Sequence, residues 1–259
     1  MRKVLGALTV VLSVALVCSF MVTAAAVLLA ERQERNLRLE RIRHILAVVG
    51  IEAAEPLSAY REAIDARLID LHRAEPVPLQ GLPRHLQPDA FDFDKAARDP
   101  RYGGPIPPER IGLRRRPRLM PLYVVKGHGP AAGRVALLLV GKGLWSTLYG
   151  YLALENDLRH IAGITFFEQK ETPGLGGEIA NPRWQALWRG KLAYDERGNV
   201  LIRVAKGSIP PGSSTAAYQV NGLSGATLTT RAVDRLVRYW LGPEGYGPYL
   251  ARLRREGER

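Results

Sequence analysis

The residues best suited to carry chemistry lie in the stretch "NGLSGATLTT", residues 221–230. It contains three threonines, and the string Ser-Gly-Ala-Thr occupies 224–227. A serine or threonine in front of a helix ordinarily accepts a hydrogen bond from a free amide of the first turn. The alternative is that one of these hydroxyls is the attachment point of another group. Both interpretations place the stretch immediately before a helix.

Two further stretches combine glycines with polar and aromatic side chains. Residues 141–155, "GKGLWSTLYGYLALE", have the pattern of a β-strand that follows a glycine turn. Residues 167–179, "FEQKETPGLGGEI", contain three closely spaced glycines. Because glycine has no side chain, such a run either forms a turn or lets the backbone approach a planar ligand closely. Taken alone, each stretch is compatible with a purely structural role.

Together the three stretches resemble the C-subunit family of the sodium-translocating NADH:quinone oxidoreductases. Ser-Gly-Ala-Thr, preceded three positions earlier by an acidic or amide residue and followed by a helix, is similar to the site where FMN is joined to threonine. The order and spacing of "GLWSTLYGYLALE", "ETPGLGGEI" with "NPRWQALW", and "GLSGATLTT" also match the family pattern. The G subunit of the Rnf-type ferredoxin oxidoreductase shares the flavin motif, but "GLWSTLYG" and "WQALW" favour the quinone reductase.

The resemblance is strong from about 120 to 241, present in outline from 1 to 75 and weak across 76–118. It implies FMN attached to Thr227 through a phosphoester bond, which a separate flavin transferase makes from FAD. It also implies further cofactor-binding residues: Ser224, Gly225, Ala226, Glu171, Thr172, Leu175, Trp145, Ser146, Thr147 and Lys206. Core packing is the structural alternative for Trp145, and a solvated side chain is the alternative for Lys206. We expect no catalytic acid or base and no metal ligand.

The sequence departs from the family pattern at one position. The pattern has aspartate six residues before the modified threonine, where this chain has Asn221. An amide keeps the size and hydrogen-bonding capacity of the side chain but loses its charge. If the family carboxylate serves the transferase or a metal, attachment in this chain is expected to be less efficient.

Composition limits the other chemistry that this chain can perform. The single cysteine, Cys18, lies in an apolar segment, which excludes intrachain disulfides and thiolate metal sites held by this chain alone. The five histidines show no metal-ligand spacing. Without a Gly-x-Gly-x-x-Gly fingerprint, the chain is not expected to oxidise NADH alone. The net charge of +12 comes from scattered arginines, so a solvated face, anionic lipid or an acidic partner protein explains it better than nucleic acid.

We expect a single-pass membrane anchor at 1–30. The segment from Val4 to Ala30 has no charged residue, and about 20 apolar residues suffice to cross a bilayer. By the positive-inside rule, the basic residues after this segment favour a cytoplasmic soluble part. The family resemblance instead implies a periplasmic domain on the bacterial inner membrane, and we follow the resemblance. The basic residues in question are Arg32, Arg35, Arg38, Arg41 and Arg43.

The rest of the chain is expected to fold as an α+β protein with a mostly antiparallel sheet flanked by helices. We predict an amphipathic helical segment at 31–75, a proline-rich irregular segment at 76–120 and an FMN-binding domain at 121–259. Helical spacing occurs in two runs of the helical segment, one from Leu39 to Val49 and one from Tyr60 to Leu71. Strands are predicted at 122–126, 134–140, 143–154, 160–169, 200–205 and 216–220, with helices after Asn181 and over 232–240.

The function implied by the resemblance is electron transfer by covalent FMN in a membrane respiratory complex that couples NADH oxidation by quinone to sodium export. The expected partners are the other subunits, the flavin transferase and the membrane. Two alternatives are the G subunit of an Rnf-type ferredoxin oxidoreductase and a non-catalytic membrane-anchored scaffold that keeps the flavin-domain fold.

Overall fold

The computed structural model describes residues 2–257, except for the side chains of 2–5, 8–10 and 31 within the first helix. Its contacts divide the chain into two compact units, Met1–Glu40 and Arg41–Arg259. The first helix, α1 (Arg2–Val48), runs through the first unit and ends in the second. Each unit is described by itself.

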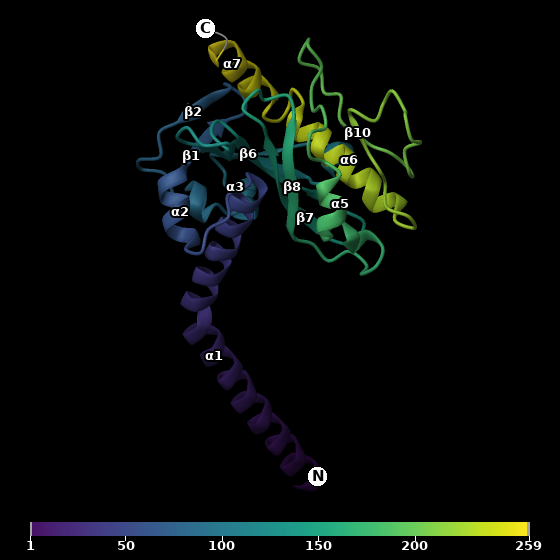
Figure 1. Cartoon of the computed structure of the whole chain (residues 1–259). Coiled ribbons are helices and arrows are strands. Elements are labelled where there is room, and N and C mark those ends of the chain that lie inside the picture. The colour runs from purple at the N-terminus through teal and green to yellow at the C-terminus, as the bar shows by residue number, and fades with distance from the viewer. Residues whose placement is uncertain (1, 258–259) are drawn as a thin grey trace. The chain divides into compact units, whose positions relative to one another are not determined.

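The first unit consists of α1 up to Glu40, at the purple end of the chain in Figure 1. Within it, Val11–Ala30 has a mean hydropathy of 2.5, and its large apolar side chains are exposed. In the described part of the chain, α1 is the one helix long and apolar enough to cross a membrane. The predicted single apolar N-terminal helix is therefore confirmed.

The second unit is built on a six-stranded antiparallel sheet with the order β2-β1-β5-β6-β7-β8 (Figure 1). Strands β5 to β8 follow one another along the chain as hairpins, whereas β1 pairs with β5 along its whole length. The α+β class with a mostly antiparallel sheet is thus confirmed. The strands are β1 (Ile64–Asp70), β2 (Glu75–Val77), β5 (Leu119–Val125), β6 (Val135–Lys142), β7 (Thr147–Leu154) and β8 (Ile161–Glu168).

Short helices and two small ladders complete the second unit. The ladders are an antiparallel pair, β3 (Gly103–Pro105) with β4 (Arg115–Pro117), and a parallel pair, β9 (Arg203–Val204) with β10 (Gln219–Val220). The 3-10 turns are η1 (Arg84–Leu86), η2 (Pro88–Ala90) and η3 (Gly176–Ala180). The helices after α1 are α2 (Pro56–Ala63), α3 (Phe93–Arg98), α4 (Pro108–Ile111), α5 (Pro182–Ala186), α6 (Thr227–Leu241) and α7 (Gly247–Gly257).

Helix α6 is held on the sheet by the apolar stripe that the sequence predicts. Leu236 and Trp240 are fully buried, and the Trp240 indole N–H donates to the Val140 carbonyl at 2.9 Å. A Cβ added at Gly141 of β6 would lie 2.6 Å from a Leu236 methyl, so glycine allows this close approach. The sheet therefore fixes the axis of α6, and with it the place where α6 begins.

The prediction of a helix from Tyr60 to Leu71 is wrong beyond Ala63. Residues Ile64–Asp70 form β1, between β2 and β5. Leu68 and Ile69 are adjacent and both fully buried, as happens in a strand covered on both faces. Pairing with neighbouring strands overrides the helical spacing of Ile64 and Leu68, because local periodicity is a weaker determinant than the tertiary contacts.

The proline-rich segment consists of short pieces, as expected of a chain that prolines interrupt repeatedly. It contains η1, η2, α3, β3, α4 and β4. Just after the segment, Pro121 lies inside β5, although proline has no backbone N–H to donate to a strand ladder. Strand β6 pairs only with Leu122–Val124, so Pro121 lies beyond that ladder and its missing N–H interrupts no bond of it.

The predicted strands at 122–126, 134–140 and 160–169 are confirmed as β5, β6 and β8. The prediction at 143–154 starts too early, because β7 begins at Thr147 and 143–146 form a turn. Within the strands predicted at 200–205 and 216–220, the structure has only the two-residue strands β9 and β10. Strands β1 and β2 precede residue 121 but belong to the same sheet as β5, so the sheet itself does not begin at 121. The boundary of an FMN-binding domain at 121 stays a prediction.

Candidate functional site

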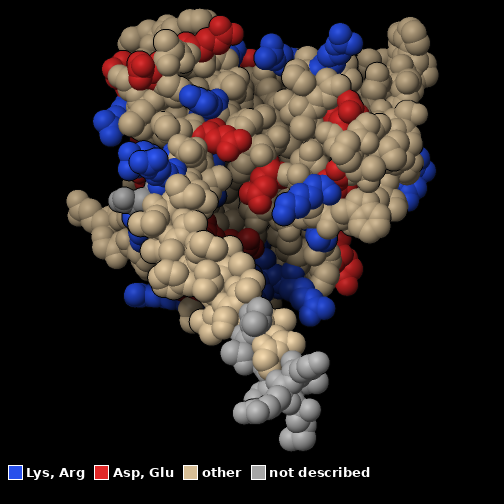
Figure 2. Space-filling view, turned by 90° about the horizontal axis from the view of Figure 1, so that it is seen from below, with Lys and Arg blue, Asp and Glu red and all other residues tan. Residues whose placement is uncertain are grey.

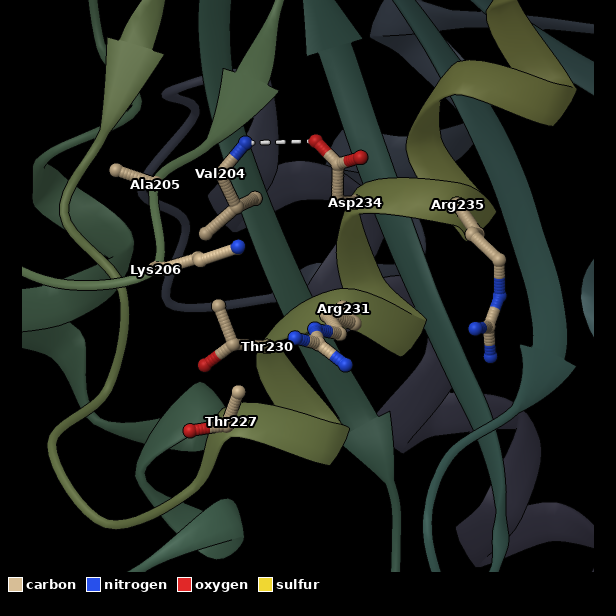
Figure 3. A pocket seen from close by; sticks show the side chains of 8 residues that line it. All are labelled: Val204, Ala205, Lys206, Thr227, Thr230, Arg231, Asp234 and Arg235. Carbon is tan, nitrogen blue, oxygen red and sulfur yellow. Dashed lines mark hydrogen bonds between the residues drawn. The ribbon is translucent and has the colours of Figure 1, made fainter.

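Thr227 is the first residue of α6, and its side chain is exposed. It lines a pocket of about 270 Å³ between the start of α6 and the segment that follows β9. Figure 3 shows Thr227 and Thr230 on the helix, facing the segment that carries Val204 and Lys206. The hydroxyl singled out in the sequence therefore lies at the edge of a cavity, next to the free amides of a helix N-terminus.

Charged side chains of both signs surround this pocket. Lys206 points toward α6 from the segment after β9, and Arg231 projects from α6 one turn beyond Thr227 (Figure 3). Asp234 also lines the pocket and accepts a hydrogen bond from the Val204 backbone at 2.8 Å. Burial raises the pKa of the Asp234 carboxyl, against the opposing effects of the Val204 amide and nearby arginines. Asp234 thus ties the Lys206 segment to the helix.

The carboxylate of Glu171 joins the other two stretches to α6. It is buried and accepts four hydrogen bonds from the turn at 144–146, at 3.0–3.1 Å: from the amides of Leu144, Trp145 and Ser146 and from the Ser146 hydroxyl. It accepts a fifth from the Thr229 hydroxyl at 2.7 Å. One side chain therefore fixes the turn before β7 against the first turn of α6.

The pKa of Glu171 reflects this set of donors. Burial by itself would raise the pKa, but the hydrogen bonds to the carboxylate outweigh it and hold the pKa below its usual range. The donors are the Thr229 hydroxyl and the amides of Ser146, Trp145 and Leu144. Glu171 therefore remains ionised at neutral pH and acts as a fixed acceptor rather than as a proton donor.

Two glycines allow close contacts in this part of the structure, one beside Glu171 and one beside Leu175. A Cβ added at Gly176 would lie 2.5 Å from the Thr229 hydroxyl oxygen and 3.1 Å from the Cβ of Glu171. Gly225 has a φ of +73°, and a Cβ there would lie 2.9 Å from a Leu175 methyl. Gly176 therefore serves close packing within the protein, which is neither of the two roles that the sequence leaves open for the glycine-rich stretch.

An unusual number of large apolar side chains are exposed on these same segments. Trp145 is 68% exposed, Leu175 43% and Leu228 55%. Trp145 is therefore not a core residue, which removes its structural alternative. Leu175 contacts the turn before Thr227, and Leu228 directly follows it. Exposed apolar side chains gathered at one site indicate a surface that meets a ligand or a partner.

The structure thus brings together most of the predicted site residues. Ser224 and Gly225 are exposed in the turn before α6, and Ala226 is buried directly beneath it. Thr172 is exposed, and its carbonyl closes the glycine-rich turn by accepting from the amides of Leu175 and Gly177. Thr147, which begins β7, makes no described contact with the pocket or with Glu171.

The capping interpretation, one of the two that the sequence offers for these hydroxyls, is wrong. The residue at the cap is Ala226, without a side-chain hydrogen bond. Thr230 instead accepts from the Leu223 amide at 3.2 Å, and Thr229 donates to Glu171. These two threonines are buried and engaged, whereas the Thr227 hydroxyl remains exposed at the pocket.

Sequence reasoning misses several residues that line the pocket. Arg231 is detectable, because a residue four positions after Thr227 lies on the same face of a helix. Asp234 and Arg235 follow on the next turn, and no local pattern marks the pocket-lining role of Val204 and Ala205. Their contribution depends on the contact between β9 and α6, which are distant in the sequence.

The FMN-binding domain family matches residues 143–242, a range that includes the Glu171 turn, the Lys206 segment and the start of α6. The fold and the site therefore define a flavoprotein domain that binds FMN. Other relatives match nearly the whole chain. The C subunit of the Na(+)-translocating NADH-quinone reductase from Pseudomonas aeruginosa is 40% identical over 96% of this chain and 95% of its own. Its counterpart from Yersinia pestis is 39% identical over 95% and 92%.

Solved structures agree with these relatives. The crystal structure of Shewanella oneidensis NqrC superposes with a TM-score of 0.74 at 28% identity, covering 84% of this chain and 98% of that one. A second structure, the C subunit of the reductase from Parabacteroides distasonis, gives a TM-score of 0.65 at 28% identity over 86% and 96%. The chain belongs to the C-subunit family of the Na(+)-translocating NADH-quinone reductases, and is thus a component of that complex.

Proposed function

We propose that this protein carries FMN as a phosphoester on Thr227 and passes electrons between other centres of the complex. The observation that supports this most directly is the exposed Thr227 hydroxyl on the rim of the pocket, while the neighbouring hydroxyls of Thr229 and Thr230 are buried and bonded. The bound flavin would supply the chemistry of accepting and releasing electrons. The chain's own residues hold and orient it.

Attachment requires a flavin transferase, since a threonine hydroxyl is a weak nucleophile. The Thr227 oxygen forms a bond to the phosphorus on the FMN side of FAD, and the diphosphate bridge breaks. AMP leaves with the bridging oxygen, and the hydroxyl proton is released. Thr227 is accessible for this reaction because its side chain is exposed.

The residues around Thr227 fit a flavin phosphate. The phosphoester carries about one negative charge, which free amides at a helix N-terminus and nearby cations favour. Lys206 and Arg231 supply those cations from the two sides of the pocket. Exposed Trp145, Leu175 and Leu228 are the apolar side chains that would contact the ring.

The test is the intact mass of the full-length chain made together with a flavin transferase. We expect a mass increase of one FMN less one water, located on the peptide that contains Thr227. Fluorescence of the denatured protein in a gel separates a covalent flavoprotein from a scaffold that only keeps the fold. A chain of unmodified mass from cells with an active transferase would contradict the proposal.

Replacing both cations is expected to slow attachment. In Lys206→Gln with Arg231→Gln we expect a rate lower by about tenfold, because each of these two exposed cations contributes up to about 1 kcal/mol to holding an anion. The measurement is the holoprotein fraction against time, with transferase limiting, at two salt concentrations. Arg189→Gln is the matched control, because Arg189 is an exposed arginine that does not line the pocket. An equal loss in the control would contradict a specific role for the two cations.

The proposed electron transfer takes place within a sodium-translocating complex that oxidises NADH with quinone, as the names of the relatives indicate for those proteins. The partners are the other subunits, the transferase during maturation and the membrane. On the face shown in Figure 2, basic and acidic side chains are interspersed and separated by uncharged surface. Such a surface suits protein partners, and it gives no argument for a nucleic-acid partner.

We place the second unit on the periplasmic side of the bacterial inner membrane. The family resemblance supports this orientation, whereas the arginines after the span favour the opposite one; the charge rule is statistical. Alkaline phosphatase fused after Arg259 is therefore expected to be active, and green fluorescent protein at the same place to be dark. If the green fluorescent protein fusion were fluorescent and the alkaline phosphatase fusion inactive, the second unit would be cytoplasmic.

A further inference from the structure

Both the side chain and the main chain of Asn221 accept hydrogen bonds. It directly follows β10, six positions before Thr227. Its Oδ1 accepts a hydrogen bond from the Ile209 amide at 2.8 Å, and its main-chain oxygen accepts from the Trp184 indole N–H at 2.9 Å. The buried Trp184 thus holds the backbone of Asn221, while the side chain reaches the segment after β9.

That segment, residues 205–209, contains Lys206 of the pocket. Two main-chain bonds hold its first part: the Ala205 amide donates to Val220 at 2.8 Å, and the Gly222 amide donates to Gly207 at 3.0 Å. The two backbones are so close that a Cβ added at Gly222 would overlap the Ala205 oxygen. The bond from Ile209 to Asn221 is the third and closes the segment at its far end.

The residues after Ile209 cannot replace this third bond. Pro210 and Pro211 follow, and proline has no backbone N–H to donate. The Ile209 amide is therefore the last donor before Gly212 that can hold the segment near Lys206. Among the described hydrogen bonds, this is the only one between the stretch from Gly207 to Gly212 and a side chain, and it is lost when residue 221 has no acceptor.

We infer that residue 221 is a positioning residue, which sets the Lys206 segment beside Thr227 through an acceptor oxygen and needs no charge to do so. The inference rests on the proposed attachment at Thr227. A carboxamide oxygen and a carboxylate oxygen fill this role equally, because each accepts the Ile209 N–H. We therefore expect asparagine at this position to leave the efficiency of flavin attachment unchanged. A role for the charge of a carboxylate would instead predict a lower efficiency.

The experiment compares three full-length variants, each coexpressed with a limiting amount of flavin transferase. Asn221→Asp keeps an acceptor and adds a charge, whereas Asn221→Leu keeps the approximate size and removes the acceptor. Asn199→Leu is the matched control, because the hydrogen bonds that the structure describes for Asn199 are to Asp195 of its own turn. The holoprotein fraction by intact mass and the hydrogen exchange of the Ile209 amide are both measured.

We expect Asn221→Asp and Asn199→Leu to match the unsubstituted chain in attachment. In Asn221→Leu, the Ile209 amide should exchange about fivefold faster, as the loss of one hydrogen bond implies, and attachment should slow severalfold. Rescue by aspartate after failure of leucine identifies the acceptor as the required feature. If the leucine variant does not accumulate, the aspartate variant still decides between an acceptor and a charge.

Two results would overturn the inference. One is attachment to Asn221→Leu at the unsubstituted rate. The other is a severalfold gain or loss of attachment in Asn221→Asp with the Ile209 amide still protected, which would show that charge matters. If the unsubstituted chain itself carries no flavin at Thr227, the proposed attachment fails, and that outcome is distinct from either of these.

Discussion

Thr227→Ala is expected to carry no covalent FMN and to unfold at nearly the same temperature as the unsubstituted chain. The proposed bond is made by the Thr227 hydroxyl oxygen, which alanine lacks. The side chain is exposed and does not cap α6, so its loss is expected to change the free energy of unfolding by no more than about 0.5 kcal/mol. Intact mass after coexpression with the transferase measures the flavin, and a thermal melt measures the fold.

Three variants serve as controls for this prediction. Thr227→Ser keeps a hydroxyl and is expected to retain flavin. Thr229→Val and Thr230→Val each remove a buried hydroxyl, bonded to Glu171 and to the Leu223 amide respectively. Each should lower the free energy of unfolding by about 1 kcal/mol and keep the flavin. A flavin adduct that persists in Thr227→Ala would contradict the assignment of the attachment site.

The sequence is most informative where a function depends on residues close together in the chain. Thr227 is predicted from a contiguous string and from the helix that follows it. The structure adds the reason why this threonine differs from its two neighbours: the hydroxyls of Thr229 and Thr230 are buried and hydrogen-bonded within the protein. That distinction depends on Glu171 and Leu223, so it cannot be obtained from the string alone.

Glu171 shows what local patterns cannot supply. The sequence predicts it as a cofactor-binding residue, but its carboxylate oxygens are occupied by five donors of the protein itself. The donors come from a turn that precedes it and from a helix that follows it, and only the folded sheet brings these together. The pocket also depends on the fold. Val204 of the short β9 and Lys206 just after it lie beside α6 only in the folded chain.

The predicted sheet is most accurate where strands follow one another as hairpins. β5, β6 and β8 are rich in large apolar residues and are bounded by turn residues. β1 escapes prediction because its nearby partner β2 pairs with it over only three residues, its main partner β5 lies far along the chain beyond the proline-rich segment, and its own spacing also fits a helix. A strand whose partner is distant has to be recognised from contacts that the sequence does not display.

Glu171→Gln is expected to destabilise the second unit and to loosen the turn that carries Trp145. Glutamine places an N–H₂ group where one carboxylate oxygen now accepts hydrogen bonds, so buried donors lose their acceptor. A buried donor left without a partner costs about 1–3 kcal/mol in the free energy of unfolding. Denaturant unfolding of the full-length chain in detergent measures this loss. The exposed Glu168→Gln is the matched control and should be neutral within about 0.5 kcal/mol.

The pH dependence of that loss provides the sharper test. The pKa of Glu171 is lower in the folded protein than in the unfolded chain, so its ionised form contributes stability fully above the unfolded pKa of about 4.3. That contribution is lost as the pH falls through the lowered folded pKa, when the carboxylate becomes protonated. The difference in unfolding free energy between the unsubstituted chain and Glu171→Gln should therefore be constant above about pH 5.5 and shrink below it. A difference that stays level or grows on acidification would show that Glu171 does not act as an ionised acceptor.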